Sequence, residues 1–167
     1  MSRHTSKGPI RIGALGPKMS TRPYLRDGRA PPPVSRTTSK VMRANRGKDT
    51  KPELALRKAL RAVGLLGYRL HKRDLPGRPD VSFGRPKVAV QIHGCYWHRC
   101  PRCRLSIPKV HQAFWKNKFN RNRARDRRDR RRLEREGWRV VTVWECEVHK
   151  DPTRAAQRVL ALVKDRR

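Results

Sequence analysis

The sequence predicts an α/β domain in which a mixed central sheet is flanked by helices. Two observations support this expectation: short apolar strand segments occupy the middle of the chain, and helical segments precede, interrupt and follow them. The length of 167 residues suits one domain with an additional tail. We therefore expect one folded domain over residues 36–167, preceded by an arm over residues 1–35.

The arm is basic and rich in proline. Six prolines and seven Lys or Arg residues fall within residues 1–35, against the single acid Asp27. A segment without apolar periodicity cannot bury enough surface to offset its ordering entropy, so we expect it to be disordered. It could add non-specific affinity for DNA, and an extension without a role explains it equally well.

The first predicted helix follows a capping signal. The run from Thr50 to Glu53 is typical of a capping box with proline in the first turn. The helix should extend to about Val63, because Leu56, Leu60 and Val63 lie on one apolar stripe. Glycines at 64 and 67 then end it.

Three short strands should come next. Tyr68–Lys72 alternates apolar and polar residues, and Asp80–Phe83 follows a turn rich in proline and glycine at 75–79. Val88–Ile92 is a nearly continuous apolar run, which indicates a strand covered on both faces.

Two helices and a fourth strand complete the chain. A long polar helix should span Val110–Arg135 before Gly137, and Val140–Val143 should form a strand. Asp151 and Pro152 are typical first residues of a last helix. Its apolar side carries Val159, Leu162 and Val163. The expected order is helix, three strands, helix, strand, helix.

The charge points to a polyanionic partner. The chain has 44 Lys and Arg against 13 Asp and Glu, a net charge of +31. Nucleic acid is the first candidate, although a ribosomal or histone-like protein or an anionic membrane surface would also fit. No segment approaches the roughly 18 apolar residues of a membrane span, and no signal peptide is evident. We expect a soluble protein of the bacterial cytoplasm, associated with the nucleoid.

The four cysteines have metal-ligand spacing. Cys95, Cys100 and Cys103 form C-x4-C-x2-C, and Cys146 follows the fourth strand. Four thiolates match tetrahedral Zn²⁺, and such a closed set predicts a structural rather than a catalytic zinc. Four unrelated cysteines are the alternative, and His98 could compete as a ligand.

Acidic and histidine side chains indicate a second, catalytic metal. Asp80 begins one strand, and Ile92 and His93 end the next, an arrangement that can hold Mg²⁺ near a phosphate. A simple turn or cap carboxylate explains Asp80 equally well. Glu53 shares the inward face of the first helix and could reach the site, although a capping role explains it fully.

The long helix carries eleven Lys or Arg within residues 116–135, which suits phosphate binding. One of its stripes consists of Trp115, Phe119, Asn122, Asp126, Asp129 and Leu133. Two carboxylates are unusual on an inward stripe. Asp126 could therefore pair with His93 or His98 at the active site. Intrahelical pairing of Asp126 with Arg130 and of Asp129 with Arg125 is the alternative that spacing favours.

Aromatic residues lie close to the cysteines. Tyr96 and Trp97 fall between Cys95 and Cys100, and Trp115 opens the long helix. Exposed aromatics on a basic protein can stack on bases or wedge between them. Packing over the zinc loop is the alternative.

At these residues the sequence resembles the very short patch repair endonucleases, also called DNA mismatch endonucleases. The resemblance covers roughly residues 36–150, in the family's order. Its motifs are Ser39–Arg43, Pro52–Arg57, Leu75–Asp80, His93–His98, Phe114–Trp115, Arg125–Asp129, Gly137–Trp138 and Val143–Cys146.

The resemblance implies a restriction-endonuclease-like core and an enzyme that nicks 5′ to the thymine of a T:G mismatch. Such mismatches arise when 5-methylcytosine deaminates. It further implies that Asp80 and the backbone carbonyl of Ile92 bind Mg²⁺, and that His98 is either the general base or the group that orients the attacking water. His93 would contact the phosphate or a metal-bound water.

The resemblance gives other residues supporting roles. Glu53 and Asp126 would support the catalytic groups. Intercalation beside the mismatch would fall to Tyr96, Trp97 and Trp115. Backbone contacts are expected from Arg121, Arg123, Arg127 and Arg128.

The expected partner is duplex DNA with a T:G mismatch, bound by a monomer that also contacts repair factors. The cofactors would be catalytic Mg²⁺ and structural Zn²⁺. Two other functions remain: a nuclease of the same fold with another target, such as a restriction enzyme, and a zinc-stabilised nucleic-acid-binding protein without catalysis. The second would not explain the grouping of Asp80, His93 and His98.

Overall fold

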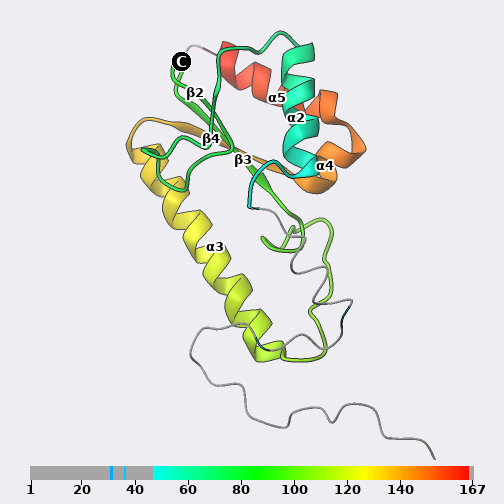
Figure 1. Ribbon diagram of the computed structural model, residues 1–167. Helices are drawn as coiled ribbons and strands as arrows, with labels where there is room; N and C mark the ends of the chain where they lie inside the picture. Colours follow the sequence, from blue (N-terminus) through cyan, green and yellow to red (C-terminus); the bar gives the residue numbers. More distant parts are fainter. Residues whose placement is uncertain (1–30, 32–35, 37–46, 166–167) are drawn as a thin grey trace, which may run out of the picture.

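The computed structural model describes Pro31, Arg36 and residues 47–165 (Figure 1). The predicted arm over 1–35, apart from Pro31, lies outside the described residues. So does the motif Ser39–Arg43. The division at residue 36 therefore stays a prediction.

The elements follow the predicted order with one addition. The described part of the chain forms α2 (Lys51–Ala62), β1 (Arg69–Leu70), β2 (Val81–Phe83), β3 (Val88–His93), α3 (Gln112–Arg135), β4 (Arg139–Trp144), α4 (Glu145–Lys150) and α5 (Pro152–Lys164). The short α4 was not predicted, because its six residues are too few to show helical periodicity.

The sheet is mixed, as predicted. Its order is β1-β2-β3-β4, with antiparallel pairing from β1 to β3 and parallel pairing between β3 and β4. His93 is paired with Trp144, so both strands end at the same edge of the sheet. The cysteine loop after β3 and Cys146 after β4 therefore begin side by side.

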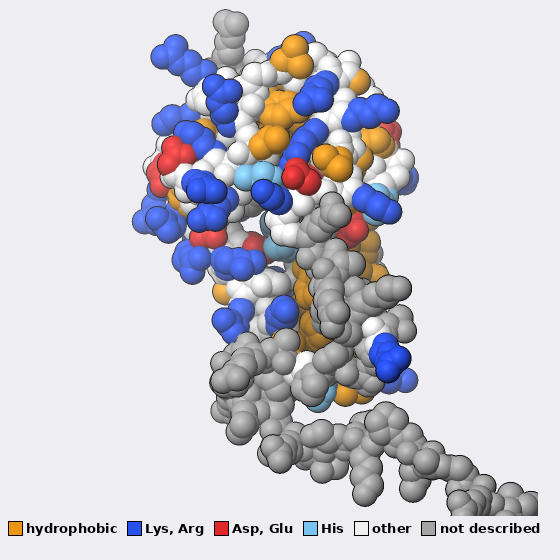
Figure 2. All heavy atoms as spheres, in the orientation of Figure 1, with side chains coloured by type: hydrophobic (Ala, Val, Ile, Leu, Met, Phe, Trp, Pro, Cys, Tyr) orange, Lys and Arg blue, Asp and Glu red, His pale blue; other side chains and the backbone are white. Residues whose placement is uncertain are grey.

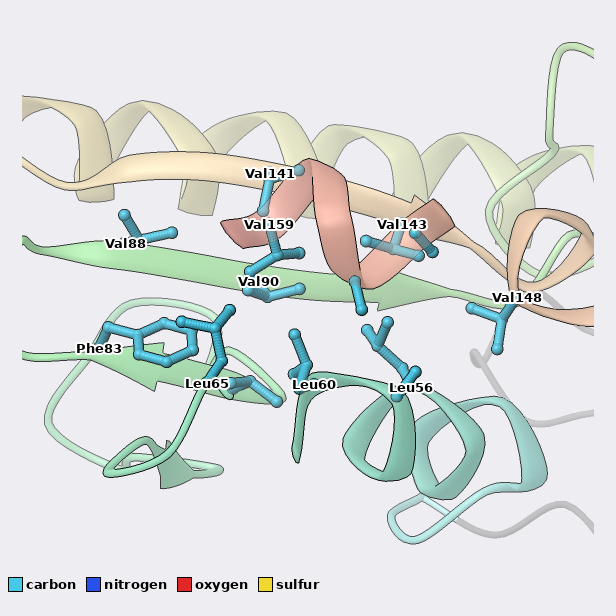
Figure 3. Close-up of a cluster of buried hydrophobic side chains, with 14 residues drawn as sticks. Leu56, Leu60, Leu65, Phe83, Val88, Val90, Val141, Val143, Val148 and Val159 are labelled. Carbon is cyan, nitrogen blue, oxygen red and sulfur yellow. The ribbon is translucent and has the colours of Figure 1, made fainter. Parts of the chain in front are cut away.

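Helices cover both faces of the sheet (Figure 1). On one face α2 and α5 pack Leu56, Leu60 and Val159 against Val88 and Val90, in the buried cluster drawn in Figure 3. On the other face Leu133 of α3 packs with Leu75, Ala89 and Trp138. Alternate residues of β3 thus enter two cores, which confirms the prediction that this strand is covered on both sides.

The end of the chain also agrees with the sequence. The Asp151 carboxylate accepts a hydrogen bond from the backbone N–H of Arg154 at 2.8 Å and caps α5 as expected. Val159 is fully buried, and Leu162 and Val163 pack partly against the same core.

The predicted capping box of α2 is wrong. Thr50 accepts no bond from the helix; its hydroxyl donates instead to Glu53 Oε1 at 2.8 Å. Glu53 Oε2 accepts the backbone N–H of Asp49 at 2.9 Å, one residue earlier than a capping box requires. The reason is Arg57, whose buried guanidinium donates to the same Oε2 at 3.1 Å and holds the carboxylate.

The first strand is shorter than predicted. Only Arg69–Leu70 of the expected Tyr68–Lys72 is extended in the sheet, because His71 adopts a left-handed conformation with φ 45° and ends the pairing.

None of the helices in the described ranges is long and apolar enough to cross a membrane.

Gly77 is a position where the fold tolerates no side chain. Its φ is +69°, and a Cβ there would lie 2.9 Å from the Cβ of the buried Asp129. We expect Gly77→Ala to lower the free energy of unfolding by about 2–4 kcal/mol, the sum of a left-handed backbone and a steric clash. Urea unfolding measures this loss.

Gly67 supplies the matched control for this prediction. It has φ +75° but open space around its Cβ position. Gly67→Ala should therefore cost only the backbone term, about 1 kcal/mol. Equal losses in the two variants would contradict the clash with Asp129.

Candidate active site and metal centre

A single wide cleft gathers the predicted site residues. It measures about 2090 Å³, far above the roughly 300–1000 Å³ of a small-molecule pocket. The groups that line it come from α2, the loops around β2, the end of β3, the cysteine loop and α3. They include Glu53, Asp80, Ile92, His93, Tyr96, Trp97, His98 and Asp126. Lys and Arg side chains cover much of the face shown in Figure 2.

Asp80 lies at the floor of this cleft, immediately before β2. Its Oδ2 accepts the backbone N–H of Ile92 at 2.6 Å, across the β2–β3 pair. Burial raises the pKa of Asp80 to about 6, and the nearby Glu53 carboxylate adds to the rise. A carboxylate that is costly to ionise in the empty protein is well placed to bind a cation.

Asp80 does not belong to a cluster of three metal-ligating side chains among the described residues. This agrees with Mg²⁺ chemistry, since Mg²⁺ usually binds one or two carboxylates and completes its shell with waters and substrate phosphates. The residues therefore fit a magnesium ion shared with DNA. The role of the Ile92 carbonyl stays a prediction.

His71 connects Asp80 to α2. Its Nε2 lies 3.0 Å from the Arg57 guanidinium and 3.5 Å from Glu53 Oε2, and its Nδ1 lies 3.8 Å from Asp80 Oδ1. Arginine can only donate, so Nε2 of His71 must accept and Nδ1 carries the proton that faces Asp80. Arg57 also donates to Asp49 at 2.6 Å.

This buried network was missed by sequence reasoning. Glu53 was expected near the site, but Arg57 and His71 were not. Their one signal was that Glu53 and Arg57 lie four residues apart on α2. Nothing in the local sequence shows that His71 bridges two elements.

His98 and Asp126 form the second half of the site. His98 Nδ1 lies 2.5 Å from Asp126 Oδ2, across a separation of 28 residues. An ionised carboxylate can only accept, so Nδ1 carries the proton, and in the neutral form of the ring Nε2 keeps its lone pair. Burial is the largest single influence on the pKa of Asp126 and pushes it upward, but the hydrogen bond from His98 and the neighbouring positive charge, including that of Arg125, together lower the net pKa.

The alternative of intrahelical pairing on α3 is therefore wrong. Asp126 is turned to His98 rather than Arg130, and Arg130 pairs with Glu134 at 2.8 Å. Asp129 is buried and accepts from its neighbour Arg128 at 3.1 Å, not from Arg125. Tertiary packing places both carboxylates inward, where Arg125 and Arg130 do not reach them.

His93 stacks on His98, with ring centroids 4.1 Å apart. Burial and the neighbouring His98 together lower the pKa of His93 to about 4, although Asp126 acts in the opposite direction. His93 is thus neutral near pH 7 and can donate one hydrogen bond into the cleft. His93, His98 and Asp126 also offer ligand atoms within 4.8 Å of one another.

The four cysteines converge as predicted. One Sγ from each of Cys95, Cys100, Cys103 and Cys146 lies within 4.8 Å of the others. The Cys100 and Cys146 sulfurs are 3.9 Å apart, close to the ~3.8 Å expected for tetrahedral ligands at about 2.3 Å from zinc. The donor set therefore fits Zn²⁺. His98, the rival ligand, is bonded to Asp126 instead.

Carboxylates outside the cysteine cluster hold its loop to the sheet edge. Glu145 Oε2 accepts the backbone N–H of Cys95 at 2.9 Å. Glu147 accepts from Arg102 of the loop at 3.1 Å and from Arg158 of α5 at 2.7 Å. The cysteine loop is thereby tied to both α4 and α5, and its position also fixes His98.

The predicted DNA-contacting aromatics pack together. Tyr96, Trp97 and Trp115 lie within 6.2 Å of one another, centroid to centroid, around Phe119. Tyr96 and Trp97 are half-buried and line the cleft, whereas Trp115 is only 7% exposed. The Trp97 carbonyl accepts a hydrogen bond from Asn122 of α3 at 3.0 Å, which anchors the aromatic loop.

The four arginines expected to bind DNA, Arg121, Arg123, Arg127 and Arg128, are all exposed on α3. None of the four lines the cleft, where α3 contributes Arg125 instead.

The fold and the cleft together indicate a class of protein. A buried carboxylate and an aspartate-bound histidine line one groove on a basic α/β protein, as in enzymes that hydrolyse nucleic acids.

Comparison with known proteins identifies the family. The profile of "DNA mismatch endonuclease Vsr" matches residues 34–104. The DNA mismatch endonuclease Vsr of Escherichia coli K12 is 41% identical over 110 residues, 66% of this chain and 70% of its own. The type II nicking enzyme V.NmeDIP of Neisseria meningitidis serogroup C is 41% identical over 128 residues, which cover 76% of this chain and 86% of that enzyme.

A third relative is similar to the same degree. The type II nicking enzyme V.XorIIP of Xanthomonas oryzae pv. oryzae is 43% identical over 109 residues, 65% of this chain and 79% of its own. The chain belongs to the Vsr family of DNA mismatch endonucleases, as the sequence motifs indicated. It is thus a DNA endonuclease, a hydrolase that acts on DNA.

The raised pKa of Asp80 predicts a pH-dependent cost in stability. Between the ordinary value of 3.8 and about 6 the folded protein binds a proton that the unfolded chain releases, so ionised Asp80 destabilises the fold above pH 6. In buffer without added Mg²⁺, Asp80→Asn should be more stable than wild type at pH 8 by up to about 3 kcal/mol. The difference should vanish as pH falls toward 4.

Thermal unfolding across this pH range tests the prediction, with Asp74→Asn as the control. Asp74 is exposed and pairs with Lys72 at 2.9 Å, which lowers its pKa. Its substitution should bring no gain at pH 8. An Asp80→Asn gain that is the same at every pH would refute the link to ionisation.

The cysteine cluster predicts one structural zinc per chain. Elemental analysis of the purified protein should find about one equivalent, and Cys146→Ser should lose it and unfold at a lower temperature. Asp80→Asn is the matched control, since it should keep the zinc. Full nicking activity after verified zinc removal would rule out the structural role.

Proposed function

We propose that the protein is a strand-specific mismatch endonuclease that nicks 5′ to the thymine of a T:G mismatch, in very short patch repair of deaminated 5-methylcytosine. The observation that supports this best is the cleft itself, which is lined both by Asp80 and by the Asp126-bound His98. The E. coli relative is named a DNA mismatch endonuclease, which favours a mismatch as the target.

In this proposal Asp80 and the Ile92 carbonyl hold Mg²⁺, and the four cysteines hold Zn²⁺. When bound, Mg²⁺ neutralises charge that develops on the scissile phosphate. The ionised form of Asp80 would then be favoured over the protonated form, because the charge of a bound cation offsets the loss of hydration that burial causes. The Arg57–His71 network keeps Asp80 oriented from the α2 side.

His98 acts as the general base. Its free Nε2 takes a proton from the attacking water, and Asp126 stabilises the imidazolium that forms. His93 stays neutral and donates a hydrogen bond to a phosphate oxygen or a metal-bound water. Glu53 would not contact the substrate; it would help to position His71, whose Nε2 lies 3.5 Å from Glu53 Oε2.

Recognition rests on the aromatic cluster and on basic residues. Tyr96 and Trp97 reach the cleft and would enter the duplex beside the mispair, where weak stacking makes deformation less costly. Trp115, which was also predicted to intercalate, is buried in the free protein and would instead pack against Tyr96 and Trp97. Arg121 and Arg123 would contact the backbone of the duplex in the cleft, whereas Arg127 and Arg128, which were also predicted to contact DNA, line the outward side of α3.

Further parts of the proposal concern the whole chain. We infer a monomer in the bacterial cytoplasm, with a basic arm over 1–35 that adds non-specific affinity for DNA and an endonuclease domain over 36–167. Repair factors would be its protein partners.

A second function deserves a direct comparison because several relatives are named type II nicking enzymes. In that case the chain would nick a specific site without requiring a mismatch. The two functions differ in one property, which is the preference for a mispaired duplex.

Nicking of end-labelled duplexes tests both functions. Wild type with Mg²⁺ should nick a T:G duplex on the 5′ side of the thymine and leave the matched T:A duplex intact. Asp80→Asn and His98→Ala should each reduce the rate by at least about a hundredfold. Asp74→Asn serves as the control with an equal change of charge.

Each contrary outcome is informative. Nicking of both duplexes at one site would replace the mismatch function with the type II function. Equal rates in wild type and Asp80→Asn would remove Asp80 from the mechanism.

A further inference from the structure

We propose that the outward side of α3 binds a second segment of duplex DNA while the first lies in the cleft. The site is a shallow groove, here called the α3 outer groove, and the proposal rests on the proposed function only in taking the cleft as the place of the first duplex. Its lining consists of Ala124, Arg127, Arg128, Arg131, Glu134 and Arg135.

The α3 outer groove is separate from the cleft. The two share no lining residue. Arg131 lies nine positions after Asn122, which is about 2.5 helical turns, so these two side chains leave α3 on opposite sides. Asn122 and Asp126 face the cleft. A duplex in the cleft would contact their side of α3 and leave the groove free.

Three of the four arginines of the groove carry charges that no described residue neutralises. Arg127, Arg131 and Arg135 have no ion-pair or hydrogen-bond partner within the described part of the chain, and all three are exposed. The one acid of the groove, Glu134, is held by Arg130 at 2.8 Å. Arg128 is tied to Asp129 at 3.1 Å.

This pattern costs stability, which argues for a functional origin. Arg127, Arg131 and Arg135 repeat every four residues, and like charges at this spacing repel one another by a few tenths of a kcal/mol per pair. Small Ala124 leaves the floor of the groove open between the guanidinium groups. A polyanion in the groove would relieve the repulsion.

The dimensions fit a DNA backbone. From Arg127 to Arg135 the helix rises about 12 Å, which spans three to four phosphates of one strand at roughly 3.4 Å each. Arginine forks bind phosphate oxygens in pairs. Duplex DNA is the occupant to which we commit, because the enzyme works in its presence and the groove offers phosphate contacts without aromatic groups for unstacked bases.

A second contact would let the enzyme pass directly between DNA segments. The α3 outer groove would bind a neighbouring duplex before the first duplex dissociates from the cleft. The rate of release from the cleft should then rise with the concentration of competing duplex, whereas simple dissociation is independent of it.

The test is the dissociation rate of full-length protein from a labelled T:G duplex, in Ca²⁺ to prevent cleavage, at increasing unlabelled matched duplex. Wild type should release the label faster as competitor increases. Arg131→Gln/Arg135→Gln should show a flat rate.

The matched control is Lys58→Gln/Arg61→Gln, which removes two exposed charges from α2, outside both the groove and the cleft. This variant should keep the wild-type response to competitor. Arg131→Gln/Arg135→Gln should nick short mismatched duplexes at the wild-type single-turnover rate and unfold at no lower temperature.

Three results would overturn the proposal. They are a wild-type rate that ignores competitor duplex, a double variant that responds like wild type, and a double variant that loses affinity for the labelled duplex itself. A response to single-stranded RNA but not to duplex DNA would also overturn it. If the protein bound T:G and T:A duplexes equally, the mismatch function would fail while the competitor response could still be measured on either.

Discussion

The parallel pairing of β3 with β4 is the constraint on which the whole site depends. Two parallel neighbours end at the same edge of the sheet, so the loop after β3 and the start of α4 meet there. Parallel neighbours also need a long crossover, and α3 supplies it. One pairing therefore brings Cys146 to the cysteine loop and lays Asp126 beside His98.

The site is built at a cost to stability. Asp80 is buried enough for its pKa to rise to about 6. Arg57 is buried as well, and its Nε has no partner among the described residues. A protein selected for stability alone would avoid such groups. The core of Val88, Val90, Leu56 and Leu60 provides the apolar packing that tolerates them.

The two metal centres would serve different ends and are joined by one short loop. Cys95 and Cys100 bracket His98, so a metal held by the cysteines would fix the backbone that carries the base. Glu145 and Asn122 hold the same loop from α4 and α3. In the proposed mechanism the position of His98 would thus be set largely by groups outside the cleft that binds DNA, a common arrangement in metal-assisted enzymes.

The sequence by itself determined the element order, the two-sided burial of β3 and the cap of α5, because these depend on local periodicity and turn chemistry. It also determined the cysteine set and, through family motifs, the candidate residues Asp80, His93 and His98. Only the tertiary structure decided that Asp126 faces His98 rather than Arg130, and that His71 and Arg57 join Asp80 to α2. Such partners lie far apart along the chain or compete with equally good local ones, so spacing cannot choose between them.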